Sequence, residues 1–127
     1  MDFQTVVTLL EAEVLSRQVN HNHNFVSGAA ADLMSDVLTY APESSVLLTG
    51  LINPQVVRTA EMAGILTIVF VRGKHPPAET IQLAEEVGIP LLSTRYTMYE
   101  ACGLLYHAGL PGPGPCDLYD LPEQARK

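Results

Sequence analysis

Basic residues are scarce in this sequence. Its 127 residues include seven lysines and arginines against fourteen aspartates and glutamates, which gives a net charge of −7. The few basic residues are scattered along the chain, whereas binding to nucleic-acid phosphates depends on clustered lysine and arginine. The charge balance therefore argues against DNA or RNA binding, and we expect no nucleic-acid partner.

Cysteines and long apolar runs are also few. Cys102 lies in an apolar helical stretch and Cys116 in a Pro/Gly-rich tail, which favours reduced thiols over a disulfide framework. No apolar run approaches the ~20 residues that span a bilayer. The N-terminus also lacks the basic start of a signal peptide. Together these features predict a cytoplasmic protein with no membrane segment.

Motifs that carry catalysis are missing as well. The sequence contains no G-x-x-x-x-G-K-[ST], G-x-G-x-x-G, G-x-S-x-G, H-E-x-x-H or C-x-x-C. Arg72-Gly73-Lys74 lacks the spacing of a phosphate loop. His21 and His23 are at strand spacing, but two imidazoles are too few for a closed metal site, and a solvated loop is favoured. We therefore predict a protein that is not an enzyme, with no cofactor and no metal.

The sequence does contain three consecutive strand–helix units. Each consists of a short apolar run, a polar loop, a helical segment and a closing glycine. The longest run, Ile65–Val71, is apolar apart from Thr67 and does not alternate, as expected for a strand buried on both faces. The apolar runs cover 46–49, 65–71 and 89–92, and the glycines are Gly64, Gly88 and Gly109. This pattern predicts a single three-layer, Rossmann-like α/β domain with a mainly parallel sheet of about five strands flanked by helices. Its central strand should lie within Leu66–Val71.

The flanking regions complete the predicted organisation. Residues 2–11 read as an amphipathic helix, and Glu13–Ser16 as a short strand. A second helix begins at Ala31 or Asp32, with Leu33, Val37 and Leu38 facing inward. Pro111–Pro115 can continue neither a helix nor a central strand. We therefore place the α/β domain at residues 1–110 and a Pro/Gly-rich tail at 111–127.

Polar residues follow the predicted strands, where open α/β sheets bind their ligands. These loops combine hydroxyls, two arginines, a lysine and helix N-termini, all of which favour an anion. Ordinary polar turns and helix caps would use the same residue types, so both interpretations stay open. The candidate ligand-binding residues are Thr49, Gly50, Asn53, Arg72, Gly73, Thr94, Arg95 and Thr97.

Four segments carry a family resemblance, namely 28–37, 71–77, 84–94 and 99–106. Over about residues 1–110 the sequence resembles the DRTGG domain, which accompanies CBS domains in some pyrophosphatases. It is also similar to the N-terminal domain of HPr kinase/phosphorylase, which has a comparable R-G-x-x-P-P and I-P-L-L-x-T. Stand-alone copies occur in bacteria. The acidic–arginine pair that names the family would fall near residues 50–53, where this sequence has Leu51 and Ile52.

The resemblance implies a regulatory or dimerisation domain with no activity of its own. Our first hypothesis is a homodimer that binds a small anionic metabolite or nucleotide. The alternative is an interaction module that docks on an enzyme subunit and has no small-molecule ligand. In the second predicted helix, Leu33, Met34, Val37 and Tyr40 nearly surround the axis, so we expect one side to face a partner. If Met34 lies on that side and not in the core, a charged residue in its place should weaken association and leave the fold intact.

Overall fold

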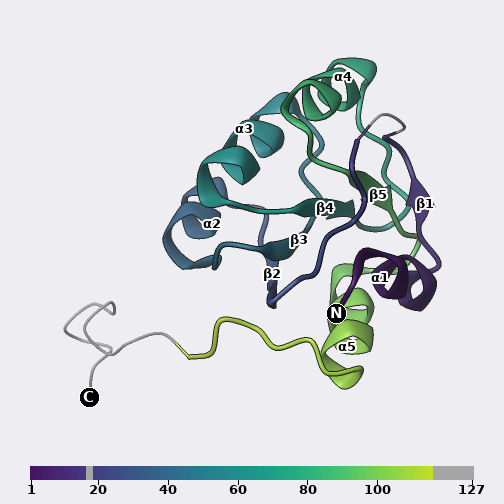
Figure 1. Ribbon diagram of the computed structural model, residues 1–127, viewed down its shortest axis with the longest axis vertical. Coiled ribbons are helices and arrows are strands. Elements are labelled where there is room, and N and C mark those ends of the chain that lie inside the picture. The colour runs from purple at the N-terminus through teal and green to yellow at the C-terminus, as the bar shows by residue number, and fades with distance from the viewer. Residues whose placement is uncertain (17–18, 116–127) are drawn as a thin grey trace.

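A computed structural model describes residues 1–16 and 19–115. Helices and strands alternate along most of this chain (Figure 1). In order they are α1 (Phe3–Leu10), β1 (Glu13–Val14), β2 (Ser27–Ala30), α2 (Met34–Tyr40), β3 (Ser45–Thr49), α3 (Pro54–Ala63), β4 (Thr67–Phe70), α4 (Ala78–Val87), β5 (Leu91–Ser93) and α5 (Met98–His107).

The strands form one five-stranded sheet in the order β1-β5-β4-β3-β2. The pairs from β2 to β5 are parallel, and only the short β1 runs antiparallel, alongside β5. β4 occupies the middle of the sheet, and all four of its residues are buried. The predicted mainly parallel sheet and its central strand are both confirmed.

Alternating side chains divide the buried residues between two helical layers. Val69 and Val71 face α1 and α5, together with Val46, Leu48 and Leu92. Ile68 and Phe70 face the opposite way, toward α2, α3 and α4. Because successive side chains of a strand point to opposite faces, one apolar run supplies both cores. The helices accordingly cover both faces of the sheet, and the predicted three-layer architecture is confirmed (Figure 1).

Several helix ends follow the sequence signals. Asn53 caps α3 by accepting a hydrogen bond from the Gln55 amide, and Pro54 occupies the first helical position, where no amide hydrogen is needed. Thr97 caps α5 by accepting from the Glu100 amide. Gly64 ends α3 in the left-handed conformation, with φ of +73°, which glycine adopts without steric cost. These local signals fix where the loops of the candidate site begin and end.

The N-terminal half departs from prediction at three places. Ser27–Ala30 is a strand, although it has no β-branched residue to indicate one. Helix α2 begins at Met34, later than expected, because the Asp32 side chain bonds to the β3–α3 loop and does not start the helix. Leu33 and Leu38 were predicted to face inward, but they are 62% and 48% exposed.

The sequence leaves open whether Met34 faces a partner or the core, and the structure packs this side chain against the core. Met34 is half-buried and packs on the core shared by α2, α3 and α4, close to the buried Val37. A charge at this position would therefore disturb the fold itself. Residues 111–115, at the start of the predicted Pro/Gly tail, form neither helix nor strand. Residues 116–127, including Cys116, lie outside the described part of the chain.

Candidate functional site

The carboxyl ends of β2, β3 and β4 bring charged side chains together around Gly50. The Asp32 carboxylate, two residues after β2, accepts hydrogen bonds from the Gly50 amide at 2.7 Å and the Thr49 hydroxyl at 3.1 Å. From the β4–α4 loop, the Lys74 ammonium donates to the Gly50 carbonyl at 3.0 Å. Parallel strands place these ends at one edge of the sheet, where ligands of open α/β sheets bind.

Gly50 leaves the space that these charged groups share. A Cβ atom at this position would lie 3.4 Å from Arg72 Nη2, 3.5 Å from Asp32 Oδ1 and 3.6 Å from Lys74 Nζ. Two cationic groups and one carboxylate therefore converge above a residue without a side chain. We call Asp32, Thr49, Gly50, Arg72 and Lys74 the Gly50 cluster. The two cationic side chains of this cluster can bind an anion, whereas the Asp32 carboxylate repels it.

The loop that carries the two cations is anchored to the neighbouring loop. The amide of Arg72 donates to the Tyr96 carbonyl at 2.8 Å, and that of Gly73 to the Thr94 carbonyl at 2.7 Å. Arg72 has a left-handed φ of +59°, an uncommon conformation for a residue with a side chain. Both amides are already bonded, so Gly73 offers no donor to a ligand. In this loop, the Arg72 and Lys74 side chains are the groups placed to contact a ligand.

Three of the predicted ligand-binding residues make side-chain hydrogen bonds within the fold. The buried Thr94 hydroxyl donates to the Leu10 carbonyl at 2.6 Å, joining β5 to the end of α1. The side chains of Asn53 and Thr97 are helix caps. For these three residues the structure favours the interpretation as ordinary turns and caps.

Arg95 lies apart from the Gly50 cluster. It lines a cavity of about 430 Å³ together with Leu10, Glu11 and Tyr96. The Tyr96 hydroxyl donates to the Glu11 carboxylate at 2.7 Å, and this hydrogen bond raises the pKa of Tyr96. The eight predicted ligand-binding residues therefore do not form one site in the structure. The fold brings Thr49, Gly50 and Arg72 together and places the two arginines in different surroundings.

Two members of the Gly50 cluster were absent from the predicted set. Asp32 was interpreted as a helix start, because the strand before it was not recognised. Lys74 was counted among the cationic groups of these loops but was not included among the candidate ligand-binding residues. Its position two residues after Arg72, in a loop following a buried strand, is a signal that could have identified it.

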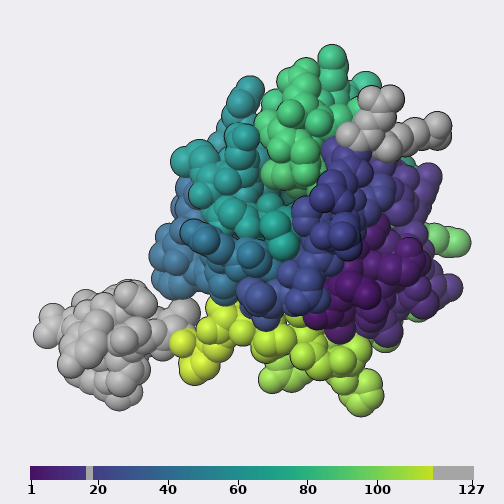
Figure 2. Space-filling model, in the orientation of Figure 1, coloured from purple at the N-terminus to yellow at the C-terminus, as the bar shows by residue number. Residues whose placement is uncertain are grey.

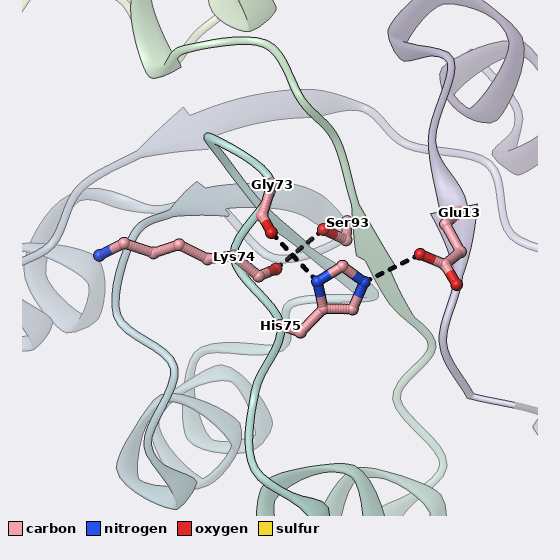
Figure 3. Close-up of polar contacts among 5 residues, drawn as sticks. All are labelled: Glu13, Gly73, Lys74, His75 and Ser93. Atoms are coloured by element: carbon pink, nitrogen blue, oxygen red, sulfur yellow. Dashed lines mark hydrogen bonds and ion pairs between the residues drawn. The ribbon is translucent and has the colours of Figure 1, made fainter.

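His75, next in the chain, ties this loop to the edge strand β1. Its Nε2 lies 2.9 Å from a Glu13 carboxylate oxygen and its Nδ1 lies 3.0 Å from the Gly73 carbonyl (Figure 3). The Ser93 hydroxyl donates to the Lys74 carbonyl at 2.8 Å. The hydrogen bond to Glu13 raises the pKa of His75, and the one to Gly73 adds to this effect. These contacts hold the backbone of residues 73–75 against β5 and β1.

We predict that Glu13→Gln lowers the pKa of His75 toward its ordinary value of about 6.5. Because the pKa of His75 is higher in the folded than in the unfolded protein, its pair with Glu13 stabilises the fold fully at pH values below the unfolded-state pKa. This stabilisation is lost as the pH rises through the folded-state pKa. The effect on stability should be small, since the His75 and Glu13 side chains are 57% and 65% exposed. NMR titration of the His75 ring measures the pKa directly. Identical His75 titration curves for wild type and variant would contradict this ion pair.

The histidine segment differs from the solvated loop that was predicted. The His21 ring stacks on Phe3, with ring centroids 4.7 Å apart and planes within 3° of parallel. The Nε2 atoms of His21 and His23 are buried and have no hydrogen-bond partner. Within residues 1–16 and 19–115, no group of three or more His, Cys, Asp or Glu side chains is placed to hold a metal ion. None of the helices described is long and apolar enough to cross a membrane.

Among known families, the DRTGG domain matches residues 5–108 of this chain. No curated protein matches the sequence. A similar solved structure contains the CBS and DRTGG domains of the regulatory region of Clostridium perfringens pyrophosphatase, complexed with its activator, diadenosine tetraphosphate. It shares 15% identity with this chain at a TM-score of 0.64. The match covers 87% of this chain and 47% of that one, so this chain corresponds to about half of the pyrophosphatase region. At 15% identity, this comparison shows a shared fold.

Proposed function

This chain belongs to the DRTGG domain family, and on that premise we propose that it is a non-enzymatic regulatory domain that binds a small anionic ligand at the Gly50 cluster. The observation that carries the proposal is the convergence of Arg72 Nη2 and Lys74 Nζ above Gly50. An arginine offers a planar fork and a lysine a compact point charge, a combination suited to phosphate or carboxylate groups. The pyrophosphatase region supports this choice, since its activator is a polyphosphate nucleotide.

The side chains around the cluster determine which ligands fit. Asp32 holds the Gly50 amide and the Thr49 hydroxyl, so neither donor is free for the ligand. Recognition therefore rests on the two cations, and Asp32 reduces the net charge of the cluster to about +1. Because attraction to a net positive site grows with the charge of the ligand, an anion with several negative charges should bind best. Nucleotides and acyl phosphates are the classes we expect.

The test is a thermal-shift screen with ADP, diadenosine tetraphosphate and acetyl phosphate. A ligand present at ~100 times its Kd adds about 2.7 kcal/mol to the free energy of unfolding. We expect at least one compound to stabilise the wild-type protein. Replacing Arg72 and Lys74 by glutamine should weaken its binding about tenfold or more for each cation, because charge-assisted hydrogen bonds contribute roughly 1.5–3 kcal/mol.

Two further variants serve as matched controls. Arg58→Gln removes an exposed arginine on α3 and should leave the ligand-induced shift unchanged. Asp32→Asn keeps an oxygen for the Gly50 amide but removes the negative charge, so it should tighten binding about fivefold, given roughly 1 kcal/mol for unit charges 4 Å apart in water. Equal binding by all variants would place any anion site elsewhere. ATP consumption that depends on Lys74 would contradict the non-enzymatic role.

A second candidate function is docking on an enzyme subunit without any small ligand. Exposed tyrosines beside the outermost strand favour it, because large apolar side chains that gather on one surface mark interaction sites. If no anion stabilises the protein in the screen above, this candidate becomes the better one. Similarity to HPr kinase/phosphorylase and a cytoplasmic location stay predictions.

A further inference from the structure

An apolar groove of about 430 Å³ lies between β2 and α5. On the side of the sheet it is lined by Gly28, Ala30 and Leu48, so no large side chain of β2 fills it. On the side of α5 it is lined by Tyr99 and Tyr106, which are 89% and 73% exposed. The volume lies within the roughly 300–1,000 Å³ of small-molecule sites. We call the space bounded by these five residues the β2–α5 groove.

The pairing of β2 with β3 joins this groove to the Gly50 cluster. Ala30 is the partner of Leu48 in the sheet, and the Ala31 amide continues the ladder by donating to the Leu48 carbonyl at 3.2 Å. Two positions further along the two chains stand Asp32 and Gly50, which are joined by the hydrogen bond from the Gly50 amide to the Asp32 carboxylate. Since extended chain rises about 3.3 Å per residue, the cluster begins about 7 Å beyond the floor of the groove.

The cations of the cluster lie over the same face of the sheet as the groove. Leu48 faces α1 and α5, and Gly50, two positions later, presents its Cα to the same side because side-chain directions alternate along extended chain. Arg72 Nη2 and Lys74 Nζ lie 3.4 and 3.6 Å from the position of a Cβ atom on Gly50. A ligand that occupies the groove can therefore reach both cations without crossing the sheet.

The two ends of the groove differ in access. At the start of β2, the Leu110 side chain lies over Gly28, with its Cδ2 3.2 Å from the position of a Cβ atom there. The Gly28 amide also donates to the Pro111 carbonyl at 2.8 Å. The chain after α5, which carries these residues, lies against the body of the domain (Figure 2). Ala30, at the other end, is exposed. The groove is thus closed at the start of β2 and opens toward the Gly50 cluster.

Charge is divided unevenly between the groove and the cluster. Among the described residues that line the groove, Glu100 alone is charged, and its carboxylate accepts a hydrogen bond from the Thr97 hydroxyl at the start of α5. The cluster, by contrast, places two cationic groups beside one carboxylate. Together they suit a ligand that is flat and largely apolar at one end and carries several negative charges at the other.

We propose that the β2–α5 groove holds the base of a nucleotide whose phosphates bind Arg72 and Lys74. This inference rests on the proposed function and narrows its ligand to nucleotides. The base stacks on the ring of Tyr99, since tyrosine rings are platforms on which every nucleobase can stack. The sugar bridges the step of about 7 Å between the groove and the cluster. An acyl phosphate would reach the two cations but leave the groove empty.

The experiment is calorimetric titration of the whole chain with ADP and with inorganic pyrophosphate, at one salt concentration and without magnesium. Both compounds carry a diphosphate, so the difference in affinity reports the base and sugar. We expect wild-type protein to bind ADP at least about tenfold more tightly than pyrophosphate, the factor that stacking of one base supplies.

Tyr99→Ala should weaken ADP binding about tenfold and leave pyrophosphate binding unchanged, because it removes the stacking surface alone. The side chain is largely exposed, so the fold should be retained. Tyr40→Ala is the matched control. Tyr40 is also an exposed tyrosine, but it lies on α2, on the opposite face of the sheet, and its loss should leave the affinities for both compounds at their wild-type values.

A second variant blocks the groove without touching a tyrosine. Ala30→Leu adds a bulky side chain at the exposed, open end, and circular dichroism should show an unchanged fold. We expect this variant to bind ADP no more tightly than pyrophosphate.

The outcomes separate this inference from the proposed function. Equal wild-type affinities for ADP and pyrophosphate, ADP binding that Tyr99→Ala and Ala30→Leu leave unchanged, or an equal loss in Tyr40→Ala would overturn the base site while the anion site stands. Binding of neither compound, or binding that does not depend on Arg72 and Lys74, would overturn the proposed function and the base site with it.

Discussion

Phe70→Ala is expected to lower the free energy of unfolding by about 3–5 kcal/mol, the largest effect of the substitutions considered. Phe70 lies at the end of the central strand β4, is completely buried and packs in the core beneath α2, α3 and α4. Truncation leaves a cavity that the neighbouring side chains fill only in part. Since small domains are stable by roughly 5–15 kcal/mol, this loss is a large share of the total. Urea unfolding followed by circular dichroism measures it.

The control for Phe70 is Met62→Ala on α3, where the side chain is 73% exposed. Surface changes of this kind usually alter stability by less than about 0.5 kcal/mol. Comparable unfolding midpoints for the two variants would show that β4 is not the centre of the core. The slope of the transition should stay constant, because both variants bury nearly the same backbone surface.

Thr94→Val should cost about 1–3 kcal/mol while leaving ligand binding unchanged. The substitution keeps the shape of the side chain but removes the hydroxyl that donates to the Leu10 carbonyl. Leu10 is fully buried, so its carbonyl would lose a partner that water cannot easily replace. The Tyr96 amide would also lose an acceptor, at 3.3 Å. Urea unfolding gives the stability, and the ligand-induced thermal shift tests binding.

Thr8→Val is the matched control for this variant. Thr8 is exposed on α1, where its hydroxyl accepts a long, exposed hydrogen bond from Gln4 at 3.4 Å, so its loss should hardly be measurable. A Thr94→Val protein of normal stability but altered anion binding would restore Thr94 as a ligand-binding residue. That result would contradict the structural role argued for it above.

Signals within a few residues of each other predicted well. Asn53-Pro54 and Thr97 through Glu100 place the starts of α3 and α5, because a cap bonds to amides two or three positions ahead. The apolar run around β4 identifies the central strand, since only a strand covered on both faces tolerates such a sequence. By contrast, β2 could not be recognised. Its small residues have little strand propensity, and its pairing with β3 comes from the tertiary fold.

Patterns in the sequence were enough to predict the layered α/β architecture and the loops in which a ligand site would lie. Which side chains in those loops meet became known from the arrangement of the strands in the folded protein. Asp32 reaches Gly50 across 18 residues and Lys74 reaches it across 24, whereas Thr94 turns to Leu10, 84 residues away. The physical reason is that a side chain's hydrogen-bond partner depends on which strands lie side by side. Local propensity carries no information about that order.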